Sequence, residues 1–224
     1  MAIGVSLEDA EWVVGLAGHT GVESVERLAG GWDNSNHRIR LVGGSSLVLK
    51  IWQAQSVPED VETVIQRHIW IDGNGIPTAV PMMLKTGARY AVRDGVAWTL
   101  LPFIEDGHLG SDAASLTSLG AVMARMHEVP PAECFPTEFK MGWTLFERMF
   151  AHAEESGEWT PFPWMLRGEL PALRESIPAG LPQGILHGDL FPDNVIGSEG
   201  EVTAILDLEE AWICLLYTSD AADE

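Results

Sequence analysis

The stretch between residues 184 and 207 carries the side chains whose types and spacing could do chemistry. His187 and Asp189 follow an apolar strand end, Asn194 comes five positions after Asp189, and Asp207 ends a second apolar run. An aspartate can accept the proton of a hydroxyl group, and the oxygens of Asn and Asp are hard ligands that suit Mg²⁺. Together these groups predict a magnesium–phosphate site.

A plainer interpretation exists for each part of this stretch. A His-Gly-Asp triplet by itself is also what a surface turn contains, and Asp207 by itself could cap a strand. The chemical interpretation depends on the joint spacing of all four polar groups between apolar strands.

A β-hairpin is expected to position Asn194 and Asp207. Val195-Ile196 and the run from Val202 to Leu206 flank the turn signal Ser198-Glu199-Gly200. Short apolar runs on either side of such a turn are typical of paired antiparallel strands. The two polar residues would then lie at the ends of neighbouring strands.

The N-terminal part alternates short apolar strands with turn signals such as Gly43-Gly44 and Asp94-Gly95. One helix is expected from Pro58 to about Asp72, and strand character is expected at 24–28, 37–41, 46–52, 82–84, 89–92 and 96–101. This order predicts an antiparallel sheet that carries a single helix.

Helical periodicity replaces strand character after Pro102. Helices are expected over residues 111–129 and 141–155, followed by proline-broken helices through Ser176. No repeat or low-complexity linker interrupts the chain, so residues 1–102 and 103–213 are expected to be two lobes rather than two tethered domains.

Composition restricts the class of protein. A hydrophobic content of 46% and nine tryptophans in 224 residues favour a packed globular protein. A formal charge of −20 argues against nucleic acid or an anionic membrane as a main partner. Two cysteines are too few for a disulfide framework, and neither a signal peptide nor a membrane-spanning run is expected. We therefore expect a cytoplasmic protein.

Residues 214–224, CLLYTSDAADE, resemble the conceptual translation of a transposase sequencing adaptor appended to a gene fragment. On this interpretation the tail is not native and the C-terminal lobe, 103–213, is truncated. The alternative is a native terminal strand that continues the apolar run at Ile213.

The segment His187-Gly188-Asp189, with Asn194 and the later Asp207-Leu208-Glu209, resembles the catalytic and metal-binding segments of the protein-kinase-like superfamily. Within it, the chain looks most like the aminoglycoside phosphotransferase and choline kinase family. The resemblance implies an α+β, protein-kinase-like two-lobed fold that uses ATP and Mg²⁺. It implies that Asp189 is the catalytic base, that Asn194 and Asp207 bind the metal, and that His187 holds the catalytic loop by a hydrogen bond.

Lys50, near the end of the third expected strand, would on this resemblance contact the α- and β-phosphates of ATP. Glu62 on the following helix would pair with Lys50, and Glu59 is the competing choice. Taken singly, the lysine could be a surface residue, and either glutamate could be a solvated charge at a helix start.

A polar loop precedes the second expected strand and contains Gly30, Gly31, Asn34 and Ser35. The resemblance places this loop over the nucleotide phosphates, where glycines allow the backbone amides to approach an anion closely. On the same resemblance, residues 100–103 would form the hinge that reads adenine; taken alone, they could equally be plain core.

Several strings look most like type II homoserine kinases: Trp32–Asn36, Gly142–Arg148 and Leu181–Asn194. The expected reaction is transfer of the γ-phosphoryl group of ATP to the hydroxyl of a small molecule, with L-homoserine as the first choice of acceptor. Choline, another amino alcohol or an aminoglycoside is the second choice, because the acidic segment 207–210 departs from the homoserine kinase pattern. A nucleotide-binding pseudoenzyme is the alternative from another class, and a truncated chain could be inactive whatever its parent does.

Overall fold

The fold is that of a computed structural model, in which residues 4–28 and 34–216 are described. The chain forms two compact units. The first comprises Met1–Arg125 with Asp189–Glu209, and the second comprises Met126–Gly188 with Glu210–Glu224. The boundary between lobes expected at residue 102 stays a prediction.

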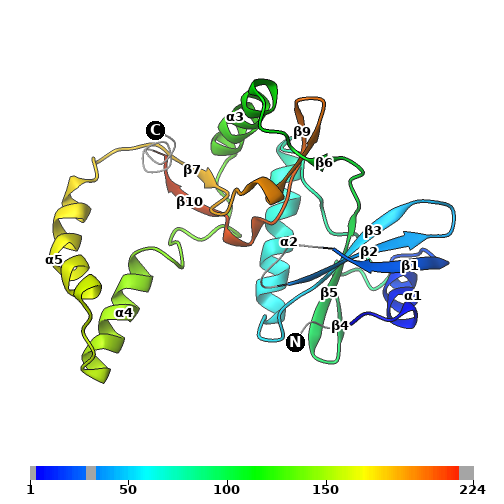
Figure 1. The fold of residues 1–224 in the computed structure, drawn as a ribbon, viewed down its shortest axis with the longest axis horizontal. Helices are drawn as coiled ribbons and strands as arrows, with labels where there is room; N and C mark the ends of the chain where they lie inside the picture. Colours follow the sequence, from blue (N-terminus) through cyan, green and yellow to red (C-terminus); the bar gives the residue numbers. More distant parts are fainter. Residues whose placement is uncertain (1–3, 29–33, 217–224) are drawn as a thin grey trace. The chain divides into compact units, whose positions relative to one another are not determined.

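The first unit is built on a five-stranded antiparallel sheet in the order β1-β2-β3-β5-β4 (Figure 1). Its strands are β1 (Val22–Arg27), β2 (Ser35–Leu41), β3 (Ser46–Ile51), β4 (Ala91–Arg93) and β5 (Val96–Pro102). Asp94 and Gly95 both have positive φ, of 52° and 77°, and they close a two-residue turn in which Arg93 pairs with Val96. This is the geometry that an Asp-Gly sequence favours between twisted strands.

Helix α1 (Leu7–Leu16) packs on one face of this sheet. A reciprocal pair of bonds between Ser6 and Asp9 caps its N-terminus, because each side chain satisfies a backbone amide of the other residue. Apolar residues of the helix and of three strands form the core on this face: Ala10, Val13, Val14, Ile39, Leu41, Leu47, Leu49, Ile51, Trp98 and Leu100.

Helix α2 (Pro58–Gly73) packs on the other face, and Figure 1 shows α1 and α2 on either side of the sheet. Proline begins this helix, at a position where its missing N–H costs nothing. Its apolar stripe contacts sheet residues Trp52 and Ala97 through Val61, Val64 and Ile65. Since neighbouring strand residues point to opposite faces, Lys50 is directed to this side, between Leu49 and Ile51 of the α1 core.

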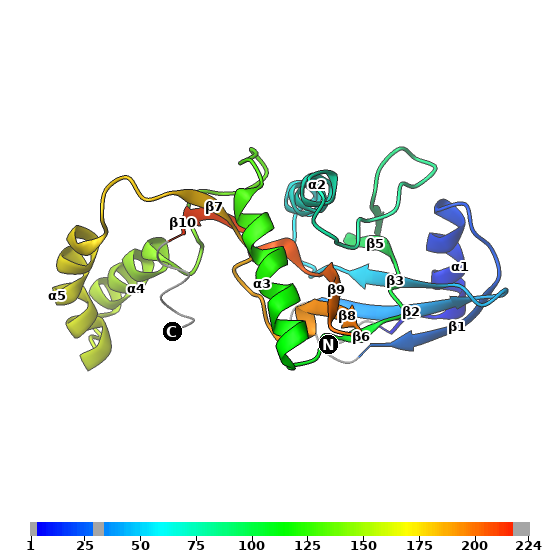
Figure 2. The same ribbon diagram turned by 90° about the horizontal axis from the view of Figure 1, so that it is seen from above.

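The three-stranded sheet β6-β8-β9 completes the first unit. Its strands are β6 (Gly107–His108), β8 (Val195–Ser198) and β9 (Glu201–Ile205). The β8–β9 hairpin lies beside helix α3 (Ala113–Glu128), as Figure 2 shows, and the amide of Val202 donates to the hydroxyl of Ser118. The short 3₁₀ helices η1 (Pro192–Asn194) and η2 (Leu208–Glu210) lie just before and just after this hairpin in the chain.

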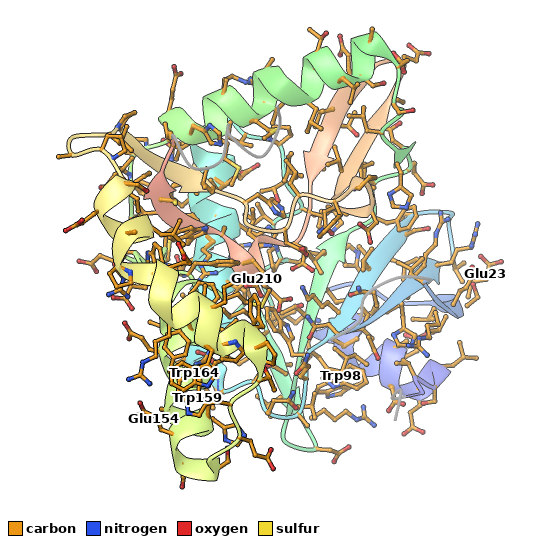
Figure 3. The ribbon with its side chains drawn as sticks, turned by 60° about the vertical axis from the view of Figure 1, so that its left-hand side comes forward. Glu23, Trp98, Glu154, Trp159, Trp164 and Glu210 are labelled. Carbon is orange, nitrogen blue, oxygen red and sulfur yellow. The ribbon has the colours of Figure 1, made fainter. Side chains whose placement is uncertain are left out.

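The second unit contains the paired strands β7 (Gln183–Leu186) and β10 (Trp212–Leu215) and the helices α4 (Trp143–Ser156) and α5 (Pro161–Ser176). Aromatic rings join the two helices at the loop between them. The ring of Trp159 lies 6.1 Å from that of Phe150 and 4.7 Å from that of Trp164 (Figure 3).

Two expectations about local structure were wrong. Residues 82–84 form no strand, because the amide of Met82 bonds to the carbonyl of Leu100 without a continuing ladder. Residues 161–176 form one helix rather than proline-broken pieces. Pro163 lies in its first turn, and the single interior Pro171 removes one hydrogen bond without ending the helix.

The predicted strand at 89–92 is shifted, since the structure has β4 at Ala91–Arg93. Strand β10 ends at Leu215, so part of the expected tail pairs with β7, and residues 217–224 lie outside the described part of the chain. None of the helices in the described ranges is both long enough and apolar enough to cross a membrane.

Candidate active site

Lys50 is held between two strands on the α2 face of the sheet. It lies opposite Asn36 on β2 and Thr99 on β5, and its side chain is 12% exposed. Its ammonium group lies 4.8 Å from the ring centre of Trp52, so the indole face covers one side of the charge. A lysine this enclosed needs anionic partners, since burial otherwise opposes its charged form.

Two carboxylates supply those partners. Lys50 Nζ lies 3.3 Å from Asp207 Oδ1 and forms a second, shorter ion pair with Glu209. Asp207 and Glu209 flank the start of η2, directly after strand β9. Lys50 and Asp207 are 157 residues apart in the sequence, and both belong to the first unit.

The three charges shift one another's pKa values. Burial by itself would lower the pKa of Lys50, but the charges of Asp207 and Glu209 outweigh it and the pKa is raised. Burial would raise the pKa of Asp207, but the nearby Lys50 ammonium holds it below its usual value. Burial raises the pKa of Glu209; Lys50 opposes that rise, and the charge of Asp207 adds to it. Two carboxylates sharing one cation therefore differ in how readily they take up a proton.

Two hydrogen bonds of Ile205 fix the backbone just before Asp207. The amide of Ile205 donates to the carbonyl of Pro77 at 2.9 Å, and the hydroxyl of Thr78 donates to the carbonyl of Ile205 at 2.7 Å. Asp207 itself has a φ of 58°, a left-handed conformation that costs most residues with a Cβ about 1–2 kcal/mol but that aspartate adopts more readily.

Arg67 of α2 holds the residues after Asp207. Its Nη1 donates to the carbonyl oxygens of Leu208 at 3.1 Å and Glu209 at 2.7 Å, and the residue is only 8% exposed. The guanidinium group thus satisfies two carbonyls of the η2 turn at once.

Asn194 joins the two polar ends of the hairpin. Its Nδ2 donates to the carbonyl oxygen of Asp189 at 2.7 Å and lies 3.3 Å from Asp189 Oδ2. The backbone carbonyl of Asn194 accepts a hydrogen bond of 2.8 Å from the backbone amide of Leu206, the residue before Asp207. The structure thus brings three predicted site residues to one end of the β8–β9 hairpin.

The donor set at this end fits a hard divalent cation. Asp207 offers a carboxylate, and Asn194, whose Nδ2 is turned to Asp189, offers its carboxamide oxygen. Within the described ranges, no group of three or more His, Cys, Asp or Glu side chains could hold a metal. A cation here would therefore be held by few protein oxygens, as is usual for Mg²⁺ bound together with phosphate groups.

Glu62, predicted to pair with Lys50, accepts a hydrogen bond of 2.7 Å from Gln66 of the same helix. The Lys50 ion pairs in the described part of the chain go to Asp207 and Glu209. The competing choice, Glu59, accepts through its backbone carbonyl from Thr63. A role for Glu62 in cofactor binding stays a prediction.

The predicted phosphate loop is described only at its end. Gly30 and Gly31 lie outside the described residues, whereas Asn34 donates to Glu209 Oε1 at 2.6 Å and accepts from the amide of Gln53 at 3.2 Å. Ser35 begins β2 and pairs with Ile51. His187 belongs to the second unit and is 5% exposed.

Two residues of this cluster were missed by sequence reasoning. Glu209 was noted only as part of an acidic segment, and Arg67 was not considered. The signal for Arg67 lies in α2, where it occupies a buried position beside Val64 and His68 on the apolar stripe. A charged residue on such a stripe needs a specific acceptor, which here is the backbone of η2.

In chemical terms, the first unit presents a cation, two acidic groups and an amide at the ends of its two sheets. Lys50 could neutralise phosphate oxygens, Asp207 with Asn194 could hold a metal, and Asp189 could accept a hydroxyl proton.

The chain is similar in sequence to curated homoserine kinases. The chain is 25% identical over 211 residues to a homoserine kinase of Rhizobium etli, an alignment that covers 91% of this chain and 64% of the relative. It is 27% identical over 220 residues to a homoserine kinase of Neisseria meningitidis serogroup B, covering 92% of this chain and 68% of the relative. The chain therefore spans about two thirds or less of the length of these relatives.

Solved structures with similar folds confirm the predicted α+β kinase-like class. The amicoumacin kinase hAmiN, in complex with AMP-PNP, Ca²⁺ and Ami, has a TM-score of 0.72 and 15% identity, over 97% of this chain and 68% of that chain. Spectinomycin phosphotransferase APH(9)-Ia, bound to ADP and spectinomycin, has a TM-score of 0.66 and 15% identity, over 94% of this chain and 71% of that chain.

A sequence model of the phosphotransferase enzyme family (APH) matches residues 24–213. That range includes Lys50, the strands of both sheets of the first unit apart from the first two residues of β1, and the whole segment from His187 to Glu209. The chain belongs to the phosphotransferase enzyme family.

Proposed function

We propose that this protein transfers the γ-phosphoryl group of ATP to the hydroxyl group of a small molecule, with L-homoserine as the acceptor. The observation that carries the proposal is the pairing of Lys50 with Asp207 beside the Asn194–Asp189 contact, in a chain of the phosphotransferase enzyme family. The homoserine assignment has its support in the two curated relatives described above.

Lys50 is proposed to bind the α- and β-phosphates, since its ammonium lies on a rigid strand and its pKa is raised, which keeps it charged at neutral pH. Asn34 and Ser35, with Gly30 and Gly31, are proposed to contact the nucleotide from the loop before β2. Glu62 is kept as a further candidate cofactor-binding residue.

Asp189 is proposed to orient the acceptor hydroxyl and to accept its proton. Asn194 fixes this carboxylate through the contacts to its carbonyl and Oδ2, so the base is held in one orientation. His187 is proposed to support the loop from its buried position. Most of the rate enhancement would then come from positioning and from charge neutralisation.

Asn194 and Asp207 are the residues proposed to hold Mg²⁺. When bound, the ion would neutralise charge on the phosphate oxygens. Lys50 contacts only Oδ1 of Asp207, so the ion would share the Asp207 carboxylate and its negative charge with Lys50. We further propose a cytoplasmic location, where ATP is available.

The test is ADP release by the 224-residue chain with Mg·ATP and, in separate reactions, L-homoserine, choline and an aminoglycoside. Turnover with homoserine above the rate without acceptor is expected. Turnover with choline or the aminoglycoside alone would move the proposal to that acceptor. Binding of Mg·ATP without turnover on any of the three would favour a nucleotide-binding pseudoenzyme, and absence of both would contradict the function.

A further inference from the structure

The two carboxylates beside Lys50, those of Asp207 and Glu209, would have different roles. Asp207 is proposed to serve the metal, so a bound ion would share its carboxylate and compete with Lys50 for the same negative charge. Lys50 would then depend less on Asp207 for its place in a mostly buried position. A lysine in that situation needs a second, permanent anion to keep its orientation.

Glu209 meets that requirement. Its carboxylate pairs with Lys50, and the same side chain accepts a bond of 2.6 Å from Asn34 Nδ2. Its own carbonyl oxygen is held at 2.7 Å by Nη1 of Arg67. The group is therefore fixed at its side chain by the residue before β2 and at its backbone by α2.

Helix α2 thus influences the position of Lys50 indirectly, through Glu209. The helix carboxylate considered from the sequence, Glu62, bonds to Gln66 along the helix. Arg67, one turn further on, bonds to the backbone of the η2 turn and so determines where Glu209 lies. The contribution of α2 to Lys50 is then made through a buried arginine and a glutamate of another segment.

We propose that Glu209 is the residue that positions Lys50 for nucleotide phosphates, with Asn34 and Arg67 holding Glu209 in place. This inference rests on the proposed function, because it concerns the ATP site of that reaction. Glu209 acts on the nucleotide only through Lys50, and it is a positioning residue rather than a catalytic one.

The first experiment measures Mg·ATP affinity by isothermal titration calorimetry for the whole chain and for the variant Glu209→Gln. This change keeps the side chain's shape and removes its charge, so affinity should fall by about tenfold, the scale of one charge-assisted contact. Glu154→Gln is the matched control, since Glu154 is also a glutamate paired with a cation, Arg167, in the second unit. It should bind like the unmodified chain.

Glu62→Gln is measured alongside and should weaken binding less than Glu209→Gln does. If Glu62→Gln has the larger effect, the direct helix pairing is correct and the proposal is overturned. An affinity that is unchanged or stronger in Glu209→Gln also overturns it, because Glu209 would then only compete with phosphates for Lys50.

A double-variant cycle tests whether Glu209 acts through Lys50. In a Lys50→Met background, adding Glu209→Gln should change Mg·ATP affinity by less than about twofold, because the residue to be positioned is already gone. A further tenfold loss in that background would assign Glu209 to another task and contradict the proposal.

Two further variants separate positioning from folding. Glu209→Asp, which keeps the charge, should recover part of the affinity that Glu209→Gln loses, and equal losses would count against the proposal. If Glu209→Gln fails to fold by circular dichroism, Asn34→Ala takes its place with and without Lys50→Met, because it removes one anchor of Glu209 and leaves the ion pair. Affinity should fall only where Lys50 is present; unchanged affinity there, or an equal loss in the Lys50→Met background, which would reflect a direct contact of Asn34 with the nucleotide, overturns the proposal. Absence of Mg·ATP binding by the unmodified chain would instead contradict the function itself.

Discussion

Asp189 and Asn194 are the pair on which the proposed transfer reaction would depend. The carboxamide of Asn194 contacts both the backbone and the side chain of Asp189, so the orientation of the carboxylate is set by a neighbour five residues away. A base held in this way loses little entropy when a hydroxyl group arrives.

Replacing Asp189 should therefore separate chemistry from binding. Asp189→Ala should lower phosphoryl transfer by about 10²–10⁴-fold, the usual contribution of a general base, while Mg·ATP affinity changes by less than about twofold. ADP release and calorimetry measure the two quantities. Asp193→Ala is the control, because Asp193 is an exposed aspartate in the same 3₁₀ turn. Equal turnover in the two variants would remove Asp189 from the mechanism.

The sequence was informative about which residues lie in one cluster, but less so about which of them form ion pairs with one another. The residues Lys50, Asp189, Asn194 and Asp207 could be selected because their order and spacing resemble a known family. The partner of Lys50 could not, because α2 contains Glu59 and Glu62 within its first turns and only the fold decides whether either faces the lysine. Glu209 reaches Lys50 because Asp207 adopts a positive φ and η2 turns directly after it, and neither can be read from residue types.

At the scale of elements, turns with specific chemistry were the most predictable parts. Asp94-Gly95 has positive φ at both residues and joins β4 to β5 in register, as its residue types favour. Glu199-Gly200 has positive φ at both residues too, although only the glycine favours it, and the strands that it joins have a register shift. Strand β6, with two residues, carries no pattern of its own and forms because β8 offers it an edge. Residues 82–84 have the apolar character of a strand but make only a single sheet-like bond, so their residue types misled.

The loop that contains Gly188 is a place where one element closely approaches another within the second unit. Gly188 has a φ of 78°, and a Cβ there would overlap the carbonyl oxygen of Glu210. Gly180 has nearly the same φ, 79°, with open space around it. The two glycines therefore share the backbone strain and differ in the contact.

This difference gives a paired test. Gly180→Ala should lower the free energy of unfolding by about 1 kcal/mol, from strain alone. Gly188→Ala should lower it by about 1–3 kcal/mol more, because atoms must also move apart. Urea unfolding followed by circular dichroism measures both, and equal losses would mean that the Glu210 segment yields without cost.

At the scale of the whole molecule, charge is the dominant feature. With 33 acidic and 13 basic residues, at most a minority of the carboxylates can be ion-paired, so repulsion among the rest opposes the compact state. The ion pairs among exposed residues, such as Arg167 with Glu154, contribute little at a surface. Salt should therefore gain more stability by weakening this repulsion than it loses by weakening the surface ion pairs.

Salt should consequently stabilise this protein. Between about 0.01 M and about 1 M NaCl the Debye length falls from about 30 Å to about 3 Å, so repulsion between distant charges is removed. The midpoint of thermal unfolding should rise over this range. Glu23→Lys, at an exposed position of β1 that Figure 3 labels, makes the net charge less negative and should reduce the rise. A midpoint that falls with salt would show that ion pairs matter more than net repulsion.

The left-handed backbone at Asp207 has a consequence for how this position can vary among related chains. Only glycine, asparagine and aspartate adopt a φ near 58° at little cost, so few replacements leave the turn into η2 intact. A lineage that lost the metal binding proposed for Asp207 could keep the local backbone by exchanging Asp207 for asparagine or glycine, whereas other residues would disturb Glu209 as well. The replacement found at this one position should therefore distinguish relatives that lost the activity alone from relatives that lost the local fold.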